Sequence, residues 1–549
     1  MHYQHVCERL RDLITREKDL RVLVDLLERL TFFEQWTDTF VATELRILWG
    51  RERLTEAMVQ LVHHQHLMGA VRLGMPGVDR MVPHLWRLSE TLTDSERLVL
   101  DVLLRRLVDP FEALMTIPLD ALFSQTEQDQ LLNANRSRQA SALAEESSGS
   151  TSRPRPGRGI CAIVKFTRLC NLRCVYCHDW AAGVGHTMPF DVQLRLFEKL
   201  FGPPEHRRVT VVWHGGEPMM IGRRNALRVL FLERWFQRPG QRLLNSMQTN
   251  GTLINADWIQ FLRHFGIRTS LSIDGPAEVH DHTRPQVHGR PTFDKSLRGL
   301  RLLQEAGLLA GVLIVVTPQL LDFGAERLVA FLRESNIRSI ELLPLRPDNN
   351  SAQPLDHSAA QDFVGFLWAV DRARVEQGEH NLYVRTLDTA LSALAGQAAR
   401  HCEFGGNCAG DFFSIDPAGD VSHCDKYLGD SDYRLGNLRS HNFDEMRRGE
   451  AMGRISAEID AGLEAMKSCQ YFRYCNGWCP HEHYLNTRPE SSDRVDCCGL
   501  GGLFEAALRD ESDTSRGRSA PSPLGPGRVQ GLGHGRTAPP LQSVHDKQV

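Results

Sequence analysis

Eleven of the thirteen cysteines in this chain fall into two groups whose spacing suits metal or cluster ligation. The first group is Cys170, Cys174 and Cys177, in the run CNLRCVYC. Three thiolates ligate three irons of a 4Fe–4S cube, which normally takes four protein ligands, so one iron stays open to an exogenous ligand. The spacing therefore predicts a cluster that binds a small molecule, more than a saturated electron carrier.

The second group of cysteines lies in the last third of the chain. Its members are Cys402, Cys408, Cys424, Cys469, Cys475, Cys479, Cys497 and Cys498. Disulfides are rare in a reducing compartment, so clustered cysteines there indicate metal or cluster ligation. Eight ligands are enough for two further clusters.

A structural zinc site is the alternative for the first group. Zinc sites favour CxxC pairs and a fourth protein ligand. His178 is the nearest candidate for that ligand, but it adjoins Cys177 and is geometrically awkward. The cluster interpretation is favoured, because the loop also directly follows the first strand of a predicted barrel.

Six short β-rich runs alternate with amphipathic helical stretches over residues 159–350. The runs are CAIVKFT, VTVVWHGG, NSMQTNG, TSLSIDG, AGVLIVVT and SIELLPL. Apolar strands separated by helices predict a parallel sheet covered on both faces. We therefore expect the α/β class, with a partial (β/α)6 TIM-type barrel whose C-terminal strand ends carry the chemistry.

The rest of the chain divides by composition. Residues 1–134 carry apolar residues at three- and four-residue spacing and predict an N-terminal helical domain. Residues 135–158 are rich in Ser, Arg, Pro and Gly, which predicts a flexible linker, and residues 511–549 predict a disordered tail. A helical connection over 351–399 leads to a small Cys-rich iron–sulfur domain at 400–505.

Charge and hydropathy argue against several classes of partner. A net charge of -4 over 549 residues gives no reason to expect nucleic acid or an anionic membrane. No apolar run reaches about 18 residues, so we expect no membrane span. The charged, helical N-terminus is not a signal peptide. We therefore expect a cytoplasmic protein with no nucleic-acid or membrane partner.

The run CNLRCVYC resembles the CxxxCxxC motif of the radical SAM superfamily, and the resemblance continues to about residue 350. WHGGEP, after the second predicted strand, matches the family's GGE motif. This implies that Gly215, Gly216 and Glu217 hold the amino group of the methionine moiety of S-adenosyl-L-methionine. QTNG and SIDGP match the next two strand ends, so Ser272 and, downstream, Arg284 are implied cofactor contacts.

The resemblance implies a definite chemistry. A reduced 4Fe–4S cluster cleaves S-adenosyl-L-methionine to a 5′-deoxyadenosyl radical, and an external electron donor such as flavodoxin or ferredoxin supplies the electron. The cofactor carries the hard chemistry, while the protein positions it and excludes solvent.

The second cysteine group resembles the SPASM extension found behind many radical SAM peptide-modifying enzymes. The implied ligands of a first auxiliary cluster are Cys402, Cys408, Cys424 and Cys479. The implied ligands of a second are Cys469, Cys475 and one or both of Cys497 and Cys498. Met466 stands where the family usually has a further cysteine, so we expect one or two auxiliary 4Fe–4S clusters.

Asp425 is the candidate catalytic residue. It directly follows Cys424 and matches an aspartate proposed to take the substrate proton in sulfatase maturases; a solvated turn residue is the alternative. HCDKY, the later LGN and the stretch from Trp213 to Arg284 most resemble cyclophane-forming maturases. The resemblance implies an oxidoreductase that crosslinks side chains of a ribosomally made precursor peptide. The alternatives are formylglycine formation by a sulfatase-type maturase and a non-enzymatic electron-transfer or zinc-binding protein.

Overall fold

The protein is described by a computed structural model. It covers residues 114–115, 117, 119–147, 158–177, 186–203, 205–238, 240–345, 360–397, 401–427, 429–487 and 498–513. These residues fall into two compact units. The predictions made for residues 1–113 and 514–549, and for His178 and Cys497, lie outside the described residues.

The first unit joins the end of the predicted N-terminal domain to two helices from the barrel region of the sequence. Its described helices are α9 (Leu119–Leu122), α10 (Gln125–Ser147), α13 (Gly222–Phe236) and α14 (Ala256–His264). The rings of Phe123 and Phe231 meet edge to face, with centroids 5.3 Å apart. Arg228 of α13 forms an ion pair with Glu127 of α10. The described end of the predicted helical domain therefore packs against α13 and does not stand apart.

The predicted linker over residues 135–158 is wrong in its first half. Helix α10 continues to Ser147, and β1 begins at Arg158. The reason lies in the run QASALAEES at residues 139–147, where Ala, Leu, Gln and Glu favour helix and no Gly or Pro interrupts them. Only residues 148–157, which lie outside the described part, remain for a linker.

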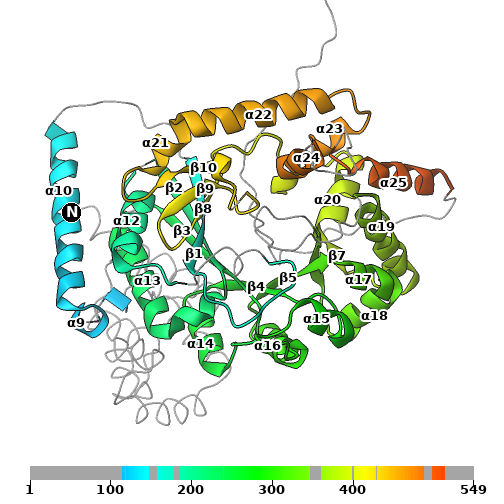
Figure 1. Cartoon of the computed structure of the whole chain (residues 1–549), viewed down its shortest axis with the longest axis horizontal. Coiled ribbons are helices and arrows are strands. Elements are labelled where there is room, and N and C mark those ends of the chain that lie inside the picture. Colours follow the sequence, from blue (N-terminus) through cyan, green and yellow to red (C-terminus); the bar gives the residue numbers. More distant parts are fainter. Residues whose placement is uncertain are drawn as a thin grey trace, which may run out of the picture. The chain divides into compact units, whose positions relative to one another are not determined.

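The second unit is built on one sheet, which has ten strands among the described residues. The strands are β1 (Arg158–Thr167), β2 (His206–Gly215), β3 (Arg242–Thr249), β4 (Arg268–Ser272), β5 (Leu309–Val316), β6 (Ser339–Pro344), β7 (Tyr383–Val384), β8 (Phe412–Ile415), β9 (Asp420–His423) and β10 (Arg434–Asn437). Their order is β10-β9-β8-β1-β2-β3-β4-β5-β6-β7 (Figure 1). Strands β1 to β6 correspond to the six predicted runs. They pair in parallel, each with the next strand along the chain.

The sheet extends beyond the predicted barrel on both sides. Strand β7, inside the expected helical connection, pairs with β6. Strand β8 pairs in parallel with β1, and β9 and β10 continue the sheet in antiparallel pairing. The Cys-rich segment therefore shares a hydrogen-bonded sheet with the barrel strands, whereas the sequence suggested a small domain organised mainly by its clusters.

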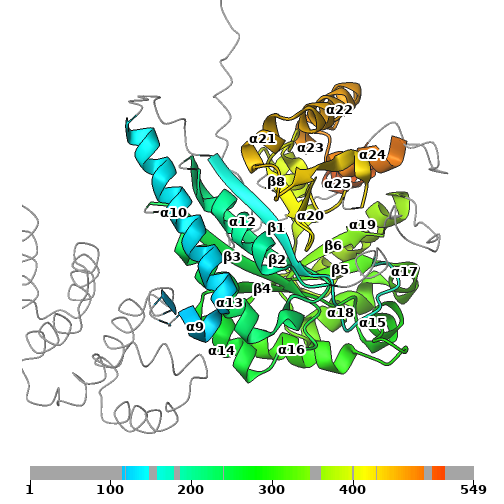
Figure 2. The same ribbon diagram turned by 60° about the vertical axis from the view of Figure 1, so that its left-hand side comes forward.

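Helices of the second unit follow the strands. They are α12 (Phe190–Phe201), η1 (Pro218–Ile221), α15 (Ala277–Thr283), α16 (Phe293–Glu305), α17 (Pro318–Phe323), α18 (Ala325–Glu334), α19 (Ala360–Glu376), α20 (Arg385–Leu394), η2 (Cys402–Phe404), η3 (Ser431–Tyr433), α21 (Phe443–Arg448), α22 (Glu450–Met466), α23 (Phe472–Cys475), α24 (Pro480–Thr487) and α25 (Gly501–Asp513). Helix α12 buries Val192, Leu196 and Leu200, which recur at helical spacing. Helix α22 lies beside α21 and α24 (Figures 1 and 2).

Two further findings concern the predicted tail and the predicted absence of a membrane span. Helix α25 runs to Asp513, so the predicted tail from 511 begins three residues too early. Within the described part of the chain, no helix has both the length and the apolar character needed to cross a bilayer.

Candidate active site

The first cysteine loop follows β1 and is held by backbone hydrogen bonds. The N–H of Arg173 donates to the carbonyl of Pro285 at 2.7 Å, and the N–H of Val175 donates to the carbonyl of Thr283 at 2.9 Å. Leu172 also forms an isolated bridge with Gln286. The loop that carries the three cysteines is therefore fixed to the chain just after α15.

The three thiols of this loop lie close together: Cys174 is buried, and Cys170 and Cys177 are half-buried. Burial raises the pKa of Cys170 and of Cys174 to about 11. The charge of Cys177 acts on Cys170, and that of Cys170 acts on Cys174, which places the three side chains in one neighbourhood. None of them forms a disulfide. Such thiols become thiolates readily only beside a cation, which is what cluster iron supplies.

The donor set fits an iron–sulfur cube better than a single zinc ion. Among the described residues, no three His, Cys, Asp or Glu side chains gather around one point that would hold a single metal ion. A zinc site needs such a point, whereas in a cube each thiolate binds a different iron.

Gly215 and Gly216 are required by the close approach of β2 to the residues that end β1. A Cβ on Gly216 would lie 2.2 Å from the carbonyl oxygen of Leu169. A Cβ on Gly215 would lie 2.5 Å from the carbonyl oxygen of Thr167, and its φ of +105° suits glycine. The two glycines thus hold the start of the cysteine loop against the GGE segment.

The Glu217 carboxylate departs from the expectation that it contacts the cofactor. It is wholly buried and accepts three hydrogen bonds from its own chain. Oε1 accepts from the Thr249 hydroxyl at 2.8 Å and from the Met219 N–H at 3.1 Å, and Oε2 accepts from the Asn250 N–H at 2.9 Å. Glu217 therefore ties the end of β2 to the end of β3, and its contact with the cofactor stays a prediction.

Arg284 and Ser272 lie in hydrogen-bonded networks near the cysteine loop. Arg284, 8% exposed, lies 3.7 Å from the Asp274 carboxylate and donates to the hydroxyl of Tyr176, the residue before Cys177. The Ser272 hydroxyl at the end of β4 accepts from the side chain of Gln248 on β3 at 2.8 Å.

Four of the later cysteines come together, and they are the set predicted for the first auxiliary cluster. Cys402 begins η2, Cys408 precedes β8, Cys424 follows β9 and Cys479 precedes α24. Burial raises the pKa of the Cys408, Cys424 and Cys479 thiols, which are half-buried, whereas Cys402 is exposed. The charges of Cys424 and Cys479 act on Cys402 and Cys408, and that of Cys424 acts on Cys479. Four segments far apart in sequence thus supply one group of thiols.

Lys426 gives this group a positive neighbour. Its Nζ lies 3.5 Å from the Sγ of Cys479, 2.9 Å from the Glu403 carboxylate and 3.3 Å from the Glu482 carboxylate. Glu403 and Glu482 are 7% and 1% exposed. The lysine therefore donates to a candidate ligand while two buried carboxylates hold it in place.

The cysteines predicted for a second auxiliary cluster are only partly described. Cys475 and Cys498 are buried at 2% and 3% exposure, and Cys469 is half-buried. Phe504 of α25 stacks on Tyr471 at 5.7 Å between centroids, which brings the chain after Cys498 beside the Cys469–Cys475 segment.

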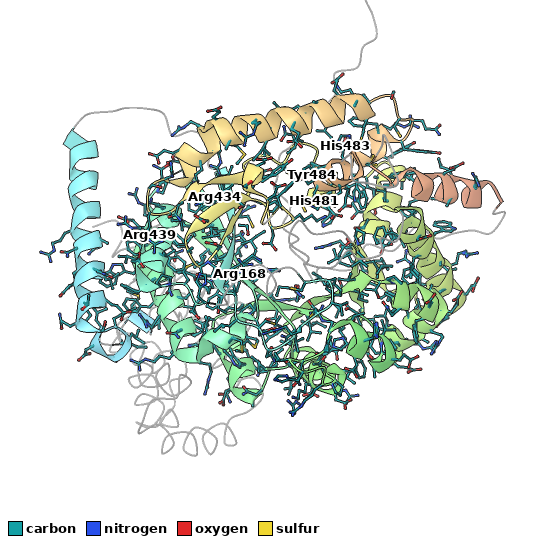
Figure 3. The ribbon with its side chains drawn as sticks, viewed as in Figure 1. Arg168, Arg434, Arg439, His481, His483 and Tyr484 are labelled. Atoms are coloured by element: carbon teal, nitrogen blue, oxygen red, sulfur yellow. The ribbon has the colours of Figure 1, made fainter. Side chains whose placement is uncertain are left out.

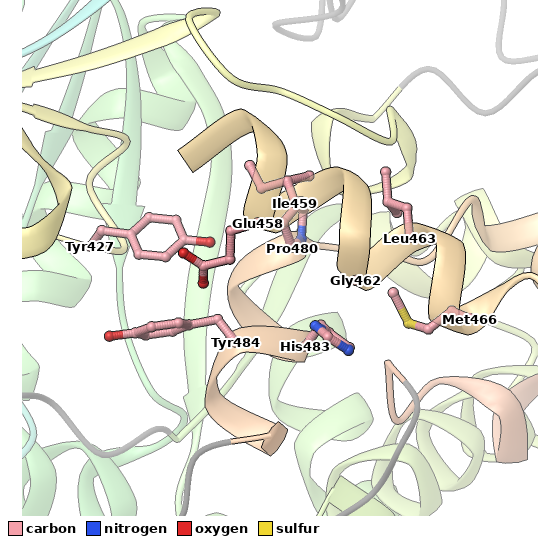
Figure 4. Close-up of a pocket in the computed structure, with 9 residues that line it drawn as sticks. All are labelled: Tyr427, Glu458, Ile459, Gly462, Leu463, Met466, Pro480, His483 and Tyr484. Atoms are coloured by element: carbon pink, nitrogen blue, oxygen red, sulfur yellow. The ribbon is translucent and has the colours of Figure 1, made fainter. Parts of the chain in front are cut away.

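Met466, which replaces the expected cysteine, is 3% exposed and lines a small cavity between α22 and α24. The cavity lining includes Tyr427, Leu463, Met466, His483 and Tyr484 (Figure 4). His481, His483 and Tyr484 all lie on α24, the helix that directly follows Cys479 (Figure 3). The Met466 side chain therefore contributes to the apolar packing between α22 and α24.

Asp425 lies against strands of the barrel and not on a solvated turn. Its side chain is 22% exposed and pairs with the ammonium of Lys165 on β1 at 3.1 Å. The Ser414 hydroxyl on β8 donates to it at 2.8 Å. The His214 ring on β2 lies 3.5 Å away. Asp425 thus meets side chains from three strands and immediately follows a member of the four-cysteine group.

Lys165, Ser414 and Tyr176 have site contacts that the sequence analysis did not predict. Lys165 offered a signal, because it is a charged residue within the apolar run CAIVKFT of a buried strand. A wholly buried ammonium needs a carboxylate partner. Ser414 and Tyr176 gave no comparable signal, because their partners are distant in sequence.

Comparison with known families agrees with the geometry. Residues 164–332 match the model of the radical SAM superfamily, and residues 402–476 match that of the iron–sulfur cluster-binding SPASM domain. The chain therefore carries a radical SAM domain and a SPASM domain, and it is an enzyme of the radical SAM class. The predicted partial-barrel α/β fold and the cofactors, 4Fe–4S clusters and S-adenosyl-L-methionine, are confirmed. The non-enzymatic alternative is wrong.

Individual relatives narrow the comparison. The chain is similar to a serine-type anaerobic sulfatase-maturating enzyme of Bacteroides thetaiotaomicron, with 26% identity over 345 residues. The match covers 58% of this chain and 82% of the relative. It is also similar to a cysteine-type anaerobic sulfatase-maturating enzyme of Clostridium novyi, with 24% identity over 353 residues. This match covers 61% of this chain and 91% of the relative. The solved structure described as native anSMEcpe with bound AdoMet shares the fold, with a TM-score of 0.56 and 23% identity over 64% of this chain and 98% of that one.

Proposed function

We propose that this chain is a peptide maturase that oxidises a side chain of a ribosomally made precursor peptide and joins it to a second side chain, as in a cyclophane. The position of Asp425 carries the proposal. Its carboxylate lies against β1, β2 and β8 and directly follows Cys424 of the four-cysteine group. A base beside a candidate electron acceptor suits an oxidation that removes one proton and one electron from a substrate radical.

The chain's own residues have distinct tasks in this reaction. Cys170, Cys174 and Cys177 would hold the first cluster, and the four later cysteines would hold an auxiliary cluster. When bound, the first cluster and S-adenosyl-L-methionine supply the 5′-deoxyadenosyl radical that takes a hydrogen atom from the peptide. Asp425 accepts the proton that leaves the peptide. In this proposal, an external donor such as flavodoxin or ferredoxin supplies the electron that reduces the first cluster.

Formylglycine formation is the second candidate, and the relatives favour it. The curated relatives compared above carry the names of serine- and cysteine-type sulfatase-maturating enzymes. Conversion of a serine or cysteine also removes one proton and one electron from a substrate radical, so the same carboxylate serves either reaction. The product therefore has to be identified chemically.

The proposal predicts a short precursor peptide encoded near this gene. Anaerobic co-expression with that peptide, followed by mass spectrometry, tests the proposal. A crosslinked peptide loses two hydrogen atoms and resists fragmentation between the joined residues. A serine-derived formylglycine also loses two hydrogen atoms but reacts with a hydrazide. A cysteine-derived one loses two hydrogen atoms and carries oxygen in place of sulfur. An unmodified peptide would overturn the crosslinking proposal, and synthetic serine and cysteine peptides then test the second candidate.

The role of Asp425 has its own test. Asp425→Asn should still form 5′-deoxyadenosine from S-adenosyl-L-methionine but should give no modified peptide. Asp432→Asn, at an exposed aspartate of η3, is the matched control and should behave as the wild type. Undiminished product from Asp425→Asn would remove this residue from the mechanism.

A further inference from the structure

The Asp425 carboxylate is bound by side chains from three strands that are neighbours in the sheet. Strands β8, β1 and β2 lie side by side, and they contribute Ser414, Lys165 and His214 respectively. Lys165 and His214 face each other across the β1–β2 ladder. The sheet itself therefore fixes the spacing of the groups that contact the carboxylate.

The two oxygens of the carboxylate have different surroundings. Oδ1 accepts from the Ser414 hydroxyl at 2.8 Å and lies 3.1 Å from the Lys165 ammonium. Oδ2 lies 3.5 Å from Nδ1 of His214. The side chains of Asp425 and His214 are 22% and 29% exposed, whereas that of Lys165 is wholly buried. Oδ1 is thus held by Ser414 and Lys165, whereas among these contacts Oδ2 meets only the partly exposed His214 side chain.

A short turn brings Asp425 to this position. Cys424 has a φ of +58°, in the left-handed region that residues other than glycine seldom adopt. Its N–H donates to the Phe412 carbonyl at 3.4 Å, the last bond of the β8–β9 pair. A strained conformation is thus maintained at the residue directly before the carboxylate that meets Lys165.

Burial of Lys165 is costly unless the charge has a use. Its neighbours in the strand, Val164 and Phe166, are buried and apolar, and an apolar side chain of similar length would avoid the desolvation of an ammonium. Retaining a buried charge opposite one carboxylate oxygen fixes the orientation of that carboxylate.

We infer that Lys165 is a positioning residue of the proposed oxidation: it holds Oδ1 of Asp425 so that Oδ2 faces the peptide. This inference rests on the proposed function and names a residue that acts through Asp425 without touching the substrate. Ser414 assists from the neighbouring strand.

The contact itself is tested without any substrate. Unfolding of Lys165→Met, Asp425→Asn and the double variant gives a double-mutant cycle. We expect the double variant to be markedly less destabilised than the sum of the two single variants, because each single change removes the same ion pair. Additive effects would overturn the inference.

The positioning role is tested by the yield of modified peptide per 5′-deoxyadenosine, using the peptide that the wild type modifies. Lys165→Met should form 5′-deoxyadenosine at the wild-type rate and retain the wild-type iron content. Its product per 5′-deoxyadenosine should fall about 100-fold, since a misplaced base costs roughly that factor. Lys165→Arg, which keeps the charge, should restore part of the yield.

Two further variants keep this test decisive. Lys199→Met removes a lysine that donates to the carbonyls of Leu438 and His441, so it loosens another link between α12 and the Cys-rich segment. It should lower the melting temperature and leave the product ratio unchanged. If Lys165→Met does not fold, Ser414→Ala removes the other Oδ1 contact without affecting a buried charge, and it should lower the ratio about tenfold, near the loss of one hydrogen bond to a charged group.

The outcomes separate the two proposals. A wild-type enzyme that modifies neither the precursor nor the serine and cysteine peptides would overturn the proposed function, and the positioning role with it. An active wild type whose Lys165→Met variant keeps the normal product ratio would overturn the inference alone.

Discussion

The hydroxyl of Tyr176 donates a hydrogen bond to Oδ2 of Asp274 at 2.6 Å. This bond joins the cysteine loop to the end of β4. Asp274 is wholly buried and also accepts from the Thr283 hydroxyl at 2.8 Å and from the Val315 N–H at 3.1 Å. One carboxylate therefore connects the loop after β1 with β4, α15 and β5.

Tyr176→Phe should loosen the cysteine loop. It removes one hydrogen bond to a charged group, and we expect the free energy of unfolding to fall by about 2 kcal/mol. Iron should leave the first site faster under a chelator, which colorimetric iron release measures. Tyr383→Phe, whose hydroxyl bonds with Thr389 at β7, is the control and should release iron at the wild-type rate. Equal rates for all three proteins would contradict the prediction.

Gly216→Ala should disrupt the first site more than any ordinary glycine substitution. The new Cβ would lie 2.2 Å from the Leu169 carbonyl, so the cysteine loop has to move. We expect loss of S-adenosyl-L-methionine binding, measured by calorimetry on reconstituted protein. Gly365→Ala in α19 meets no atom within 4 Å and should be neutral or stabilising by up to about 1 kcal/mol. Normal binding by Gly216→Ala would show that the loop tolerates the change.

Iron counting should separate the two cysteine groups. Replacing Cys170, Cys174 and Cys177 by alanine should remove about four iron atoms per chain and leave the auxiliary iron in place. Cys161→Ala is the control, because Cys161 lies within β1, 2% exposed, and belongs to neither predicted ligand set. Loss of iron from Cys161→Ala would mean that the ligand sets are wrongly drawn.

Lys426→Met should make the auxiliary cluster harder to reduce. The change removes a positive donor 3.5 Å from Cys479 and leaves the Glu403 and Glu482 carboxylates beside it. Hydrogen bonds and charge near the sulfur ligands set such potentials, so the midpoint should become more negative. A redox titration followed by electron paramagnetic resonance, in protein lacking the first three cysteines, measures it. Lys467→Met, at an exposed lysine paired with Glu464, should leave the midpoint unchanged.

Buried His280 should make the fold sensitive to acid. Burial lowers the pKa of His280 to about 4 from its usual 6.5. Its Nδ1 accepts from the Asp274 N–H at 3.2 Å, which requires a neutral ring nitrogen. Because the unfolded chain takes up this proton more readily, the stabilisation by neutral His280 is present above pH 6.5 and is lost as the pH falls towards about 4.

The magnitude can be checked by variants. The shift corresponds to about 3 kcal/mol at most. The melting temperature of His280→Gln should therefore fall less than that of the wild type between pH 6.5 and 4. His282→Gln, at an exposed histidine, should follow the wild type. Identical curves for His280→Gln and the wild type would contradict the assignment.

Local sequence patterns predicted most of the barrel strands and helices. They did not predict features that depend on pairing between residues far apart in the chain. The six barrel strands were visible because apolar runs alternate with amphipathic helices, and the cysteine spacing identified both groups of thiols. The pairing of β8 with β1 joins residues about 250 positions apart, for which a local pattern carries no signal. The part of helix α10 after residue 134 was missed because polar Ser and Arg residues hid a run of good helix formers.

The Glu217 and Lys165 side chains show the same limit within the site. A motif identified Glu217, but only the fold reveals that Thr249 and Asn250 occupy its carboxylate. Lys165 was visible as a charge in an apolar strand, yet its partner Asp425 could not be found without the sheet that brings them together.

The β1–β8 ladder has a consequence for protein engineering. Residues 161–164 of β1 pair in register with residues 412–415 of β8. The strand before the first cysteine loop and the Cys-rich segment therefore belong to one hydrogen-bonded sheet. A chimera that exchanges residues 401–487 for the corresponding segment of a relative leaves β1 paired with a foreign strand in place of β8. The exchangeable cassette must therefore include β1 together with β8, and grafts that cut between them should aggregate through the exposed strand edge.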